Sequence, residues 1–589
     1  MTPQPILPGS TLVLRGSGYM APEIASLRVA IVGQVNNQPV QWSAQPTRIS
    51  NQELQISVVG ELAERLVPAA GGVFVGHVAV TRESAFEEGP AVVSIPVSLL
   101  VTRELTPYLN TVTPTIFRPG EVIELSGSNF LFPSEGVSSV VFNGVLRTDS
   151  PALEIPLVEV EVALSPESSE DRGLLKLPIR ASVFGIRPAT YEGTLAVINT
   201  PAGGVPVRSD PLVPGPLRME GPEVETIAPL QASRGQVVMV GGRGLLPADP
   251  AEGSGTLFLL EGVLDADRGP NLVYTQDNPL GIFPDDQPSA ELAEVVLRVR
   301  INADGQAVGL GAVSGLFQGK ARAMLFYGAE RYLGPTQPLL FKVLPATQHV
   351  HLQFLPAFDE ALLDFGLLAA RTAVIQRILE VVERDFEGIN IAFATESPSN
   401  FAEYMIVEIG GEDPNGTGLF GLDNTAGKDV GNHRFDDVIG GFNADTRARG
   451  FAAYGGIFAS EFLNLSPTRG SSLLADPRFD LIFSPFCPEL GGVPASQQEA
   501  SGLGGRAQAL GEAVRAFGSL VGSTITHETG HALGLSAHSG AFHNTGDNPG
   551  WIMDAGQFRP FGERAELPGE GPAVFSPQNR TYLEEVLPL

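Results

Sequence analysis

One short pattern occurs three times within the first 245 residues of this 589-residue chain. Each copy begins with a glycine, followed by six residues and a second glycine. One further residue comes next, then a Gly or Asn, and finally a bulky apolar or aromatic residue. The glycine pairs are Gly9 and Gly16, Gly120 and Gly127, and Gly235 and Gly242. Apolar and polar residues partly alternate between the glycines, which predicts a half-buried β-strand bounded by turns or positive-φ positions. The repetition of such a strand predicts that the chain folds into a series of β-domains.

The three copies start 111 and 115 residues apart, a spacing that suits β-sandwich domains of about 100 residues. A content of 68 glycines and 48 prolines also suits short strands joined by many turns. The second copy, with Gly120, Gly127, Asn129 and Phe130, resembles the first strands of the immunoglobulin-like IPT/TIG domain family. This resemblance implies three all-β immunoglobulin-like sandwiches, which we place at residues 1–105, 106–218 and 219–346.

The sequence changes in character after Pro345. Residues 349–354, 389–394 and 404–409 are predicted strands. Residues 359–386 form a predicted long helix, because apolar residues recur with helical period and no proline interrupts them. Residues 510–533, rich in Ala, Leu and Val, form a second one. Strands and helices mixed in this way indicate an α/β or α+β domain, which we place at residues 347–589.

Four of the eight histidines fall between residues 527 and 543. His527, Glu528 and His531 form the motif H-E-x-x-H on the second predicted helix. The spacing of four puts both imidazoles on one helix face, one turn apart, where they can share a metal ion. Glu528 lies beside them and can accept a proton from water at that ion. Burying these polar groups on an apolar helix without a metal would be costly, so the motif predicts a metal site.

Two downstream residues extend the motif. Gly534 follows His531 by three residues, and Met553 lies in the segment WIMDAG. Together these residues resemble the metzincin clan of zinc metallopeptidases, whose pattern is H-E-x-x-H-x-x-G-x-x-H/D with a methionine turn. The resemblance implies a zincin-like catalytic domain in which His527 and His531 bind zinc and Glu528 is the general base. It also implies that Gly534 is the turn glycine and Met553 the Met-turn residue.

The third zinc ligand departs from the metzincin pattern, since alanine occupies position 537, where that ligand is expected. His538 lies one residue later and His543 six residues later. We place His543 ahead of His538 as the third ligand. If neither binds the ion, Asp547 or a downstream glutamate, Glu563, completes the site.

The region between residues 410 and 445 is dense in oxygen donors. A structural calcium ion could be held there by Asp423, Asp429, Asn432, Asp436 and Asp437. No EF-hand spacing is present, and a solvated turn is the alternative interpretation.

Composition excludes several other classes of protein. The net charge of −29 repels phosphate backbones, so we expect no nucleic-acid partner. The single cysteine, Cys487, excludes a disulfide scaffold and a cysteine metal cluster. The longest apolar stretches are shorter than the roughly 20 residues of a membrane helix, so we expect no transmembrane segment. A monomer is the default expectation.

These features predict a zinc-dependent endopeptidase that acts on a protein or peptide. Tandem sandwiches suit an exported bacterial protein, so we expect an extracellular or cell-surface location, with the signal segment outside this sequence. The alternative is a surface adhesion or binding protein whose zinc domain is vestigial or structural. A zinc hydrolase that cleaves a non-peptide bond is a third hypothesis.

Overall fold

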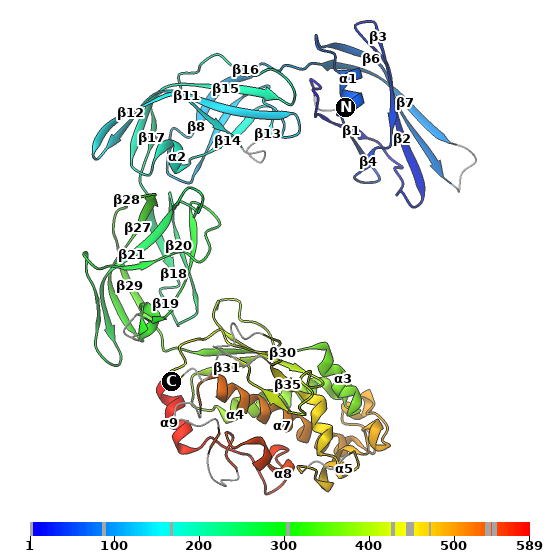
Figure 1. Cartoon of the computed structure of the whole chain (residues 1–589), viewed down its shortest axis with the longest axis vertical. Coiled ribbons are helices and arrows are strands. Elements are labelled where there is room, and N and C mark those ends of the chain that lie inside the picture. The colour runs from blue at the N-terminus through cyan, green and yellow to red at the C-terminus, as the bar shows by residue number, and fades with distance from the viewer. Residues whose placement is uncertain are drawn as a thin grey trace.

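The computed structural model describes residues 4–84, 90–164, 169–301, 307–425, 430–442, 453–469, 473–535, 543–544 and 550–589. It contains three β-sandwiches followed by a mixed α/β unit, which confirms the predicted fold class. Figure 1 shows the four units along a curved chain, with the N-terminus in the first unit and the C-terminus in the last, on its side next to the third sandwich. Each unit has a hydrophobic core of its own. The domain limits at residues 105, 218 and 346 stay predictions.

The first sandwich contains β1 (Thr11–Arg15), β2 (Ala25–Val35), β3 (Gln38–Ala44), β4 (Thr47–Arg48), β5 (Glu53–Ser57), α1 (Gly60–Leu66), β6 (Gly72–Ser84) and β7 (Ala91–Val101). One sheet has the order β1-β5-β4 and the other β3-β2-β6-β7. Alternate side chains of β1 enter the core between the sheets, where Leu12 and Leu14 are buried.

The second sandwich contains β8 (Tyr108–Thr113), β9 (Ile116–Phe117), β10 (Val122–Ser128), β11 (Gly136–Asp149), β12 (Ala152–Ala163), β13 (Ser169–Asp171), β14 (Leu174–Pro178), α2 (Ala181–Phe184), β15 (Ala189–Pro201), β16 (Val207–Arg208) and β17 (Leu217–Met219). Its sheets have the orders β13-β14-β10-β8 and β12-β11-β15-β17-β9. All of these strand pairs are antiparallel except β9 with β17, which is parallel.

The third sandwich contains β18 (Glu223–Ala228), β19 (Gln231–Ala232), β20 (Val237–Arg243), β21 (Ser254–Ala266), β22 (Leu272–Tyr274), β23 (Leu280–Ile282), β24 (Leu292–Val296), β25 (Arg300–Ile301), β26 (Ala307–Val308), the 3₁₀-helix η2 (Leu310–Ala312), β27 (Gly315–Tyr327), β28 (Glu330–Leu333) and β29 (Gln337–Val343). Its main sheets have the orders β18-β20-β24 and β19-β29-β27-β21-β22. As in the second sandwich, one short strand pairs in parallel, here β19 with β29.

The repeated glycine pattern has the same structural role in all three sandwiches. It contains β1, β10 and β20, as the alternation of apolar and polar residues predicts; the second glycine follows β1 directly and lies near the end of β10 and of β20. The first glycine of each copy has a φ between +79° and +90°. The Gly or Asn after the second glycine has a φ between +63° and +80°. Glycine and asparagine tolerate this left-handed region best. The predicted positive-φ turn is therefore confirmed for the first glycine of each pair, whereas the second glycine does not have a positive φ.

The first glycine of each copy also lies against the following unit, at a contact that we call a joint. The backbone oxygen nearest to a Cβ atom built at each glycine belongs to Ser134 for Gly9 (1.9 Å), to Leu245 for Gly120 (3.1 Å) and to Glu403 for Gly235 (2.9 Å). A larger residue would therefore push the two units apart at each joint. The repeated pattern thus contains both a strand and the turn that contacts the following unit.

Buried charges accompany the first two joints. Ser10, next to the first glycine, donates a hydrogen bond to the carboxylate of Glu135, which is fully buried. Glu135 also pairs with Arg172 at 2.7 Å. At the second joint Arg118 pairs with Glu220 at 3.1 Å and with Glu223 at 3.0 Å. These pairs offset part of the cost of burying the charges.

The third joint connects the last sandwich to the α/β unit through Arg234. Its guanidinium donates hydrogen bonds to the carbonyl oxygens of Asn432, at 3.1 Å, and His433. The same group lies 3.9 Å from the centre of the Phe435 ring. The backbone N–H of Ala402 also donates to the carbonyl oxygen of Gly235 at 2.8 Å. Side-chain and backbone contacts therefore both hold this joint.

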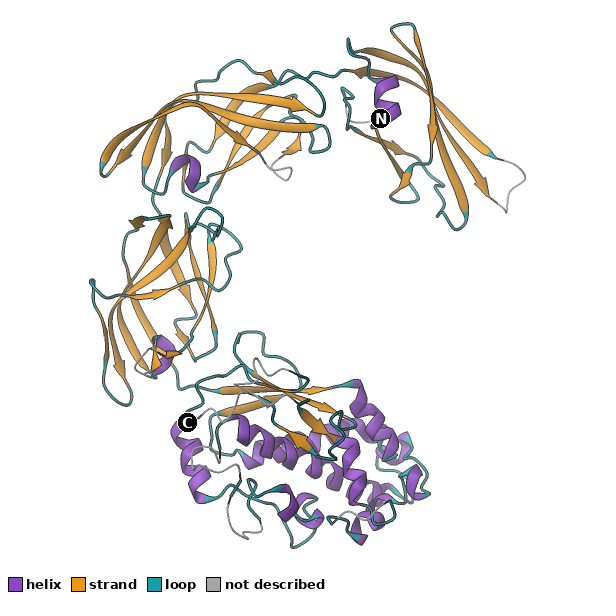
Figure 2. Cartoon of the chain, in the orientation of Figure 1, coloured by secondary structure: helices purple, strands orange, loops and turns teal. Residues whose placement is uncertain are grey.

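The α/β unit contains β30 (Gln348–Phe354), α3 (Pro356–Asp364), η3 (Leu368–Ala370), α4 (Arg371–Asp385), β31 (Ile391–Ala394), β32 (Met405–Gly410), β33 (Gly421–Leu422), β34 (Val438–Ile439), β35 (Gly456–Phe458), η4 (Ala459–Leu465), α5 (Pro477–Phe483), η5 (Pro488–Leu490), α6 (Gln497–Ala500), α7 (Ala507–Ala532), η7 (Gly556–Phe558), α8 (Phe561–Arg564) and α9 (Pro577–Val586). Its sheet has the order β31-β30-β32-β35-β33. The first four strands are parallel, and β33 runs antiparallel to β35 at the edge. Helices α4 and α7 pack together on one face of this sheet (Figure 2).

The helix predicted at residues 359–386 is interrupted. Helix α3 ends at Asp364 and α4 begins at Arg371, with Gly366 between them at a φ of +68°. A Cβ atom at Gly366 would lie 2.0 Å from the carbonyl oxygen of Phe486, so the chain turns here to pack against a distant segment. The prediction of one uninterrupted helix is therefore wrong. No helix among the described residues is both long and apolar enough to cross a bilayer.

Candidate metal centre

Helix α7 carries the H-E-x-x-H motif through the interior of the α/β unit. Every residue from 516 to 532 is buried, because the helix packs against α4, α5 and the sheet. His527, Glu528 and His531 are only 8%, 7% and 7% exposed. Their spacing puts the two imidazoles on the same face of the helix, as the sequence predicts.

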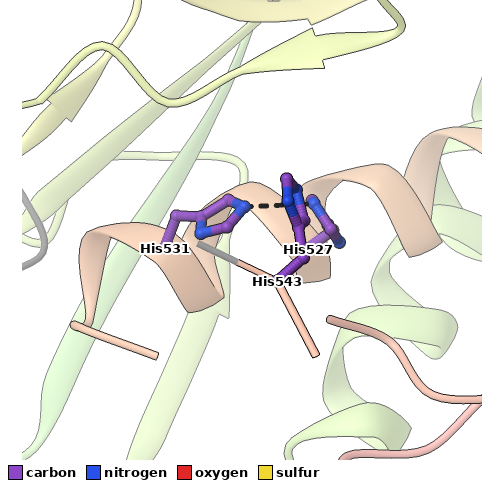
Figure 3. A group of neighbouring side chains, drawn as sticks. All are labelled: His527, His531 and His543. Atoms are coloured by element: carbon purple, nitrogen blue, oxygen red, sulfur yellow. Dashed lines mark hydrogen bonds between the residues drawn. The ribbon is translucent and has the colours of Figure 1, made fainter. Parts of the chain in front are cut away.

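Three imidazole rings converge at the end of α7 (Figure 3). The Nε2 atoms of His527 and His531 lie 3.2 Å apart. His543, which follows α7 in the chain, stacks on His527 with a distance of 5.5 Å between ring centres. One ligand atom from each of the three histidines lies within 4.8 Å of the others. The structure thus brings both histidines of the motif together with the residue that we place first as third ligand.

The backbone holds the His527 ring in one orientation. Its Nδ1 lies 2.6 Å from the carbonyl oxygen of Ile552, so Nδ1 carries the proton and donates it. The lone pair of Nε2 then points towards His531. Burial lowers the pKa of His527 well below its usual value, and the nearby His531 and Arg559 lower that pKa further. The imidazole is therefore neutral, which is the form that binds a metal ion.

This set of donors fits zinc. Two nitrogen ligands at about 2.1 Å from one tetrahedral zinc ion lie roughly 3.4 Å apart, close to the separation of the two Nε2 atoms. Three imidazoles that leave a fourth position open form the donor set of a catalytic zinc site. Within the described ranges, this is the one group of three or more His, Cys, Asp or Glu side chains close enough to share an ion.

Gly534 lies just after the end of α7, three residues after His531. It has a φ of +89°, and its N–H donates to the carbonyl oxygen of His531 at 3.0 Å. The N–H of Leu535 donates to the carbonyl oxygen of Gly530 at 2.9 Å. These two bonds form a Schellman motif, which reverses the chain after the helix. His543, nine residues after Gly534, lies beside the two histidines of α7.

Met553 lies fully buried against the same turn of α7. A Cβ atom at Gly530 would lie 2.6 Å from its Sδ atom, so a larger residue at this helix position would displace the methionine side chain. The backbone N–H of Asn544 donates to the carbonyl oxygen of Met553 at 3.0 Å. Because Asn544 is next to His543, the methionine segment also holds the third histidine in place.

Glu528 faces the edge strand β33. The backbone N–H of Asp423 donates to its Oε2 at 2.8 Å. A Cβ atom at Gly421 would lie 2.9 Å from Cγ of Glu528 and 2.8 Å from Cγ2 of Thr524, so strand and helix are as close as a glycine allows. Sequence reasoning missed these contacts because they join residues more than 100 positions apart.

The histidines and Glu528 line a cleft of about 560 Å³. One wall is the edge strand with the residues before it, including Leu419 and Phe420. The other wall includes Gly556, Gln557 and the buried Arg564. A cleft of this size is typical of a ligand site. Arg564 lies outside every motif, and nothing in the sequence singled it out.

Of the further candidates for the third ligand, the described residues include Glu563 alone. His538 and Asp547 lie outside the described residues. Glu563 accepts hydrogen bonds from Nε of Arg559 at 2.9 Å and from the N–H of Gly550 at 2.8 Å. Its carboxylate is not part of the histidine group.

The residues predicted to hold calcium have separate surroundings. Asp423 lies at the cleft, where its carboxylate accepts a hydrogen bond from the N–H of Thr425. Asn432 donates to Gln348 at 3.2 Å, and Asp437 pairs with an arginine at 2.9 Å. Asp429 lies outside the described residues. The calcium site stays a prediction, without a shared oxygen cage in the described part of the loop.

Comparisons with known proteins show no close relative. No family model matches the chain, and no curated protein matches it in sequence. Among solved structures, the chain is similar to the extracellular region of plexin A4, with 10% identity and a TM-score of 0.20, over 59% of this chain and 29% of the plexin. It is also similar to three fibronectin domains of chicken CNTN1, with 8% identity and a TM-score of 0.15, over 57% of this chain and 95% of that one. Murine CEACAM1b has 10% identity and a TM-score of 0.11, over 40% and 98%.

Proposed function

We propose that this chain is a zinc-dependent endopeptidase. The observation that carries the proposal is the convergence of three histidines, two of them buried, beside the carboxylate of Glu528 in an open cleft. When bound, zinc supplies a Lewis acid that activates water and polarises a substrate carbonyl. His527, His531 and His543 would hold the ion. If His543 is not the third ligand, His538, Asp547 or Glu563 would take its place.

Glu528 has the role of general base in this proposal. Its Oε2 accepts a hydrogen bond from the N–H of Asp423, and this bond fixes the plane of the carboxylate. The carboxylate accepts a proton from the attacking water and passes it to the leaving amine. A site with a purely structural ion has no use for this carboxylate, so its position supports catalysis.

The edge strand supports a peptide as substrate. Strand β33 pairs with β35 on one side, and its other side faces the cleft. An extended peptide can pair with such an edge through main-chain hydrogen bonds, which every peptide can form. Substrate pairing would place a peptide carbonyl between the strand and the histidines.

The test compares the purified chain with Glu528→Ala. We expect about one zinc ion per chain in both proteins, measured by atomic emission. We expect casein digestion by the native chain, its loss with a chelator, and a loss of at least about 10³-fold in Glu528→Ala. Glu584→Ala, which removes an exposed carboxylate on α9, is the matched control and should digest casein normally. Full activity of Glu528→Ala would sink the mechanism.

The third ligand is tested separately. Substitution of His543 by alanine should remove zinc, whereas substitution of His538 should leave it in place. The opposite result would assign the third position to His538. Zinc retained in both variants would point to Asp547 or Glu563.

Two other functions share parts of this evidence. A surface adhesion protein would use the sandwiches and need no proteolysis, so the casein assay separates it from the endopeptidase. A hydrolase of another bond would show zinc and a Glu528-dependent activity on esters but not on casein. We also propose export to the bacterial surface or medium, and fractionation of native cells that finds the chain in the cytosol would contradict this.

A further inference from the structure

Arg564 is a buried cation in the wall of the cleft. Its side chain lies on α8, is 4% exposed and lines the same cleft as Glu528 and the three histidines. Its Nε donates to the carbonyl oxygen of Arg559 at 3.0 Å, and Nη2 donates to that of Gly556 at 3.1 Å. The guanidinium carbon lies 5.3 Å from the centre of the Phe420 ring on the opposite wall. The backbone therefore fixes the direction in which this group points.

The partners of Arg564 differ from those of the other buried arginines. Four arginines are buried in the described part of the chain, and three of them pair with a carboxylate: Arg118 with Glu220 at 3.1 Å, Arg234 with Glu403 at 3.9 Å, and Arg559 with Glu563 at 2.9 Å. Arg564 contacts carbonyl oxygens, and no described carboxylate lies within ion-pair distance of it. A buried guanidinium without an anion is unfavourable, because the interior does not replace its hydration.

The electrostatics of the site agree with this observation. The pKa of Arg564 is lowered to about 9, mainly by burial and also by the adjacent Arg559, whereas Glu563 and Glu528 act in the opposite direction. Arg564 is still charged at neutral pH. A zinc ion held by the histidines would add two positive charges to the same cleft. The described lining of the cleft includes two carboxylates, Asp423 and Glu528, and neither forms an ion pair with Arg564.

We propose that Arg564 binds a carboxylate of the substrate next to the bond that is cleaved. The carboxylate belongs either to an Asp or Glu side chain or to the C-terminus of a short peptide, and both sources supply the same planar anion. Guanidinium and carboxylate form two parallel hydrogen bonds, which a neutral amide cannot match. This proposal rests on the proposed peptidase function, and it makes Arg564 a residue that determines specificity.

The test measures binding and does not require cleavage. Four peptides are synthesised with a reduced bond in place of the scissile peptide bond. They carry Glu or Gln beside that bond, each with a free or an amidated C-terminus. Their affinities for the zinc-loaded full chain are measured by calorimetry. We expect at least about tenfold tighter binding of the peptides that carry the recognised carboxylate than of the Gln peptide with an amidated C-terminus.

The comparison of free and amidated peptides identifies the source of the carboxylate. Preference for Glu in amidated peptides assigns the site to a side chain, and preference for the free terminus in Gln peptides assigns it to the C-terminus. In Arg564→Gln we expect the affinities to agree within about twofold. Arg580→Gln, which removes a half-buried arginine of α9 and gives the same change in net charge, should keep the native preference.

Equal binding of all four peptides to the native chain would overturn the proposal, and so would a preference that persists in Arg564→Gln. If the Arg564→Gln variant does not retain zinc, the Arg564→Lys variant is measured in its place. Lysine keeps the charge and loses the planar pair of donors, so the preference should decrease, and an unchanged preference contradicts the role of Arg564. Failure of the peptidase function is a separate result, because the chain would then bind none of the peptides or would bind them without digesting casein.

Discussion

The sandwiches and the α/β unit bury charged side chains for different reasons. Three charged residues are buried among the described residues of the sandwiches, namely Arg118, Glu135 and Arg234, and each of them lies at a joint between two units. Burial of these charges follows from the docking of one unit on the next. Their partners are carboxylates, guanidinium groups and carbonyl oxygens, and no ligand is required.

In the α/β unit the buried polar groups at the end of α7 have no such structural reason. His527 and His531 face one another, and Glu528 faces an edge strand at an open cleft. Apolar residues would satisfy the packing of this helix at lower cost. The comparison teaches that buried polar groups which converge on an open cleft, away from any joint between units, point to a ligand. The following predictions test this distinction, from the largest expected effect to the smallest.

Removal of one histidine from the α/β unit should abolish zinc binding and proteolysis, whereas removal of one from a sandwich should change neither. In His527→Ala we expect loss of bound zinc and a loss of proteolysis of at least about 10³-fold, because the ion loses a ligand held by the backbone of Ile552. His77→Ala changes an exposed histidine on β6 of the first sandwich and should alter neither quantity. Zinc content and casein digestion of the two variants are the measurements. Equal effects of the two substitutions on zinc content and digestion would contradict the distinction between the α/β unit and the sandwiches.

The close approach of β33 to α7 should be needed for activity. In Gly421→Val the side chain would collide with Thr524 and Glu528 and displace the carboxylate, so we expect about a 100-fold loss of proteolysis with zinc retained. Gly505→Val is the control, since a Cβ atom there meets nothing within 4 Å. Activity and zinc content are measured on both variants. An active Gly421→Val would show that the strand does not position Glu528.

The third joint should depend on Arg234. Arg234→Ala removes two hydrogen bonds and a cation–π contact, so we expect the joint to open more easily by about 2 kcal/mol. Hydrogen exchange of residues 400–403, followed by mass spectrometry, should then be roughly 30-fold faster. Arg331→Ala removes an arginine that lies 5.5 Å from the Phe326 ring on the exposed strand β28, and it should leave this exchange unchanged.

Two glycines of α7 should respond in opposite directions to the same change. In Gly522→Ala the added methyl group would lie 2.7 Å from Cβ of Val381 in α4, and we expect destabilisation by about 1–3 kcal/mol. In Gly511→Ala nothing lies within 4 Å, so helix propensity should stabilise the unit by about 1 kcal/mol. The thermal midpoint of the α/β unit measures both. A stabilised Gly522→Ala would contradict the tight packing of α4 on α7.

Local patterns in the sequence predicted much of this molecule. The glycine pairs correctly indicated β1, β10 and β20, because alternation and positive φ are properties of neighbouring residues. The motif of α7 likewise predicted that His527 and His531 share one face. Gly366 interrupts the helix predicted at 359–386 because of a contact with Phe486, and such a contact has no local pattern. Arg564 escaped prediction for the same reason, since only the fold places it in the cleft.

The glycine turn at each joint has a consequence for the evolution of this chain. Each sandwich carries the turn that docks it on the following unit within its own repeated pattern, at Gly9, Gly120 and Gly235. A tandem duplication of the gene segment for one sandwich therefore copies its connector as well. The number of sandwiches can then change in evolution while the connection to the α/β unit, made by Arg234 and Gly235, stays the same.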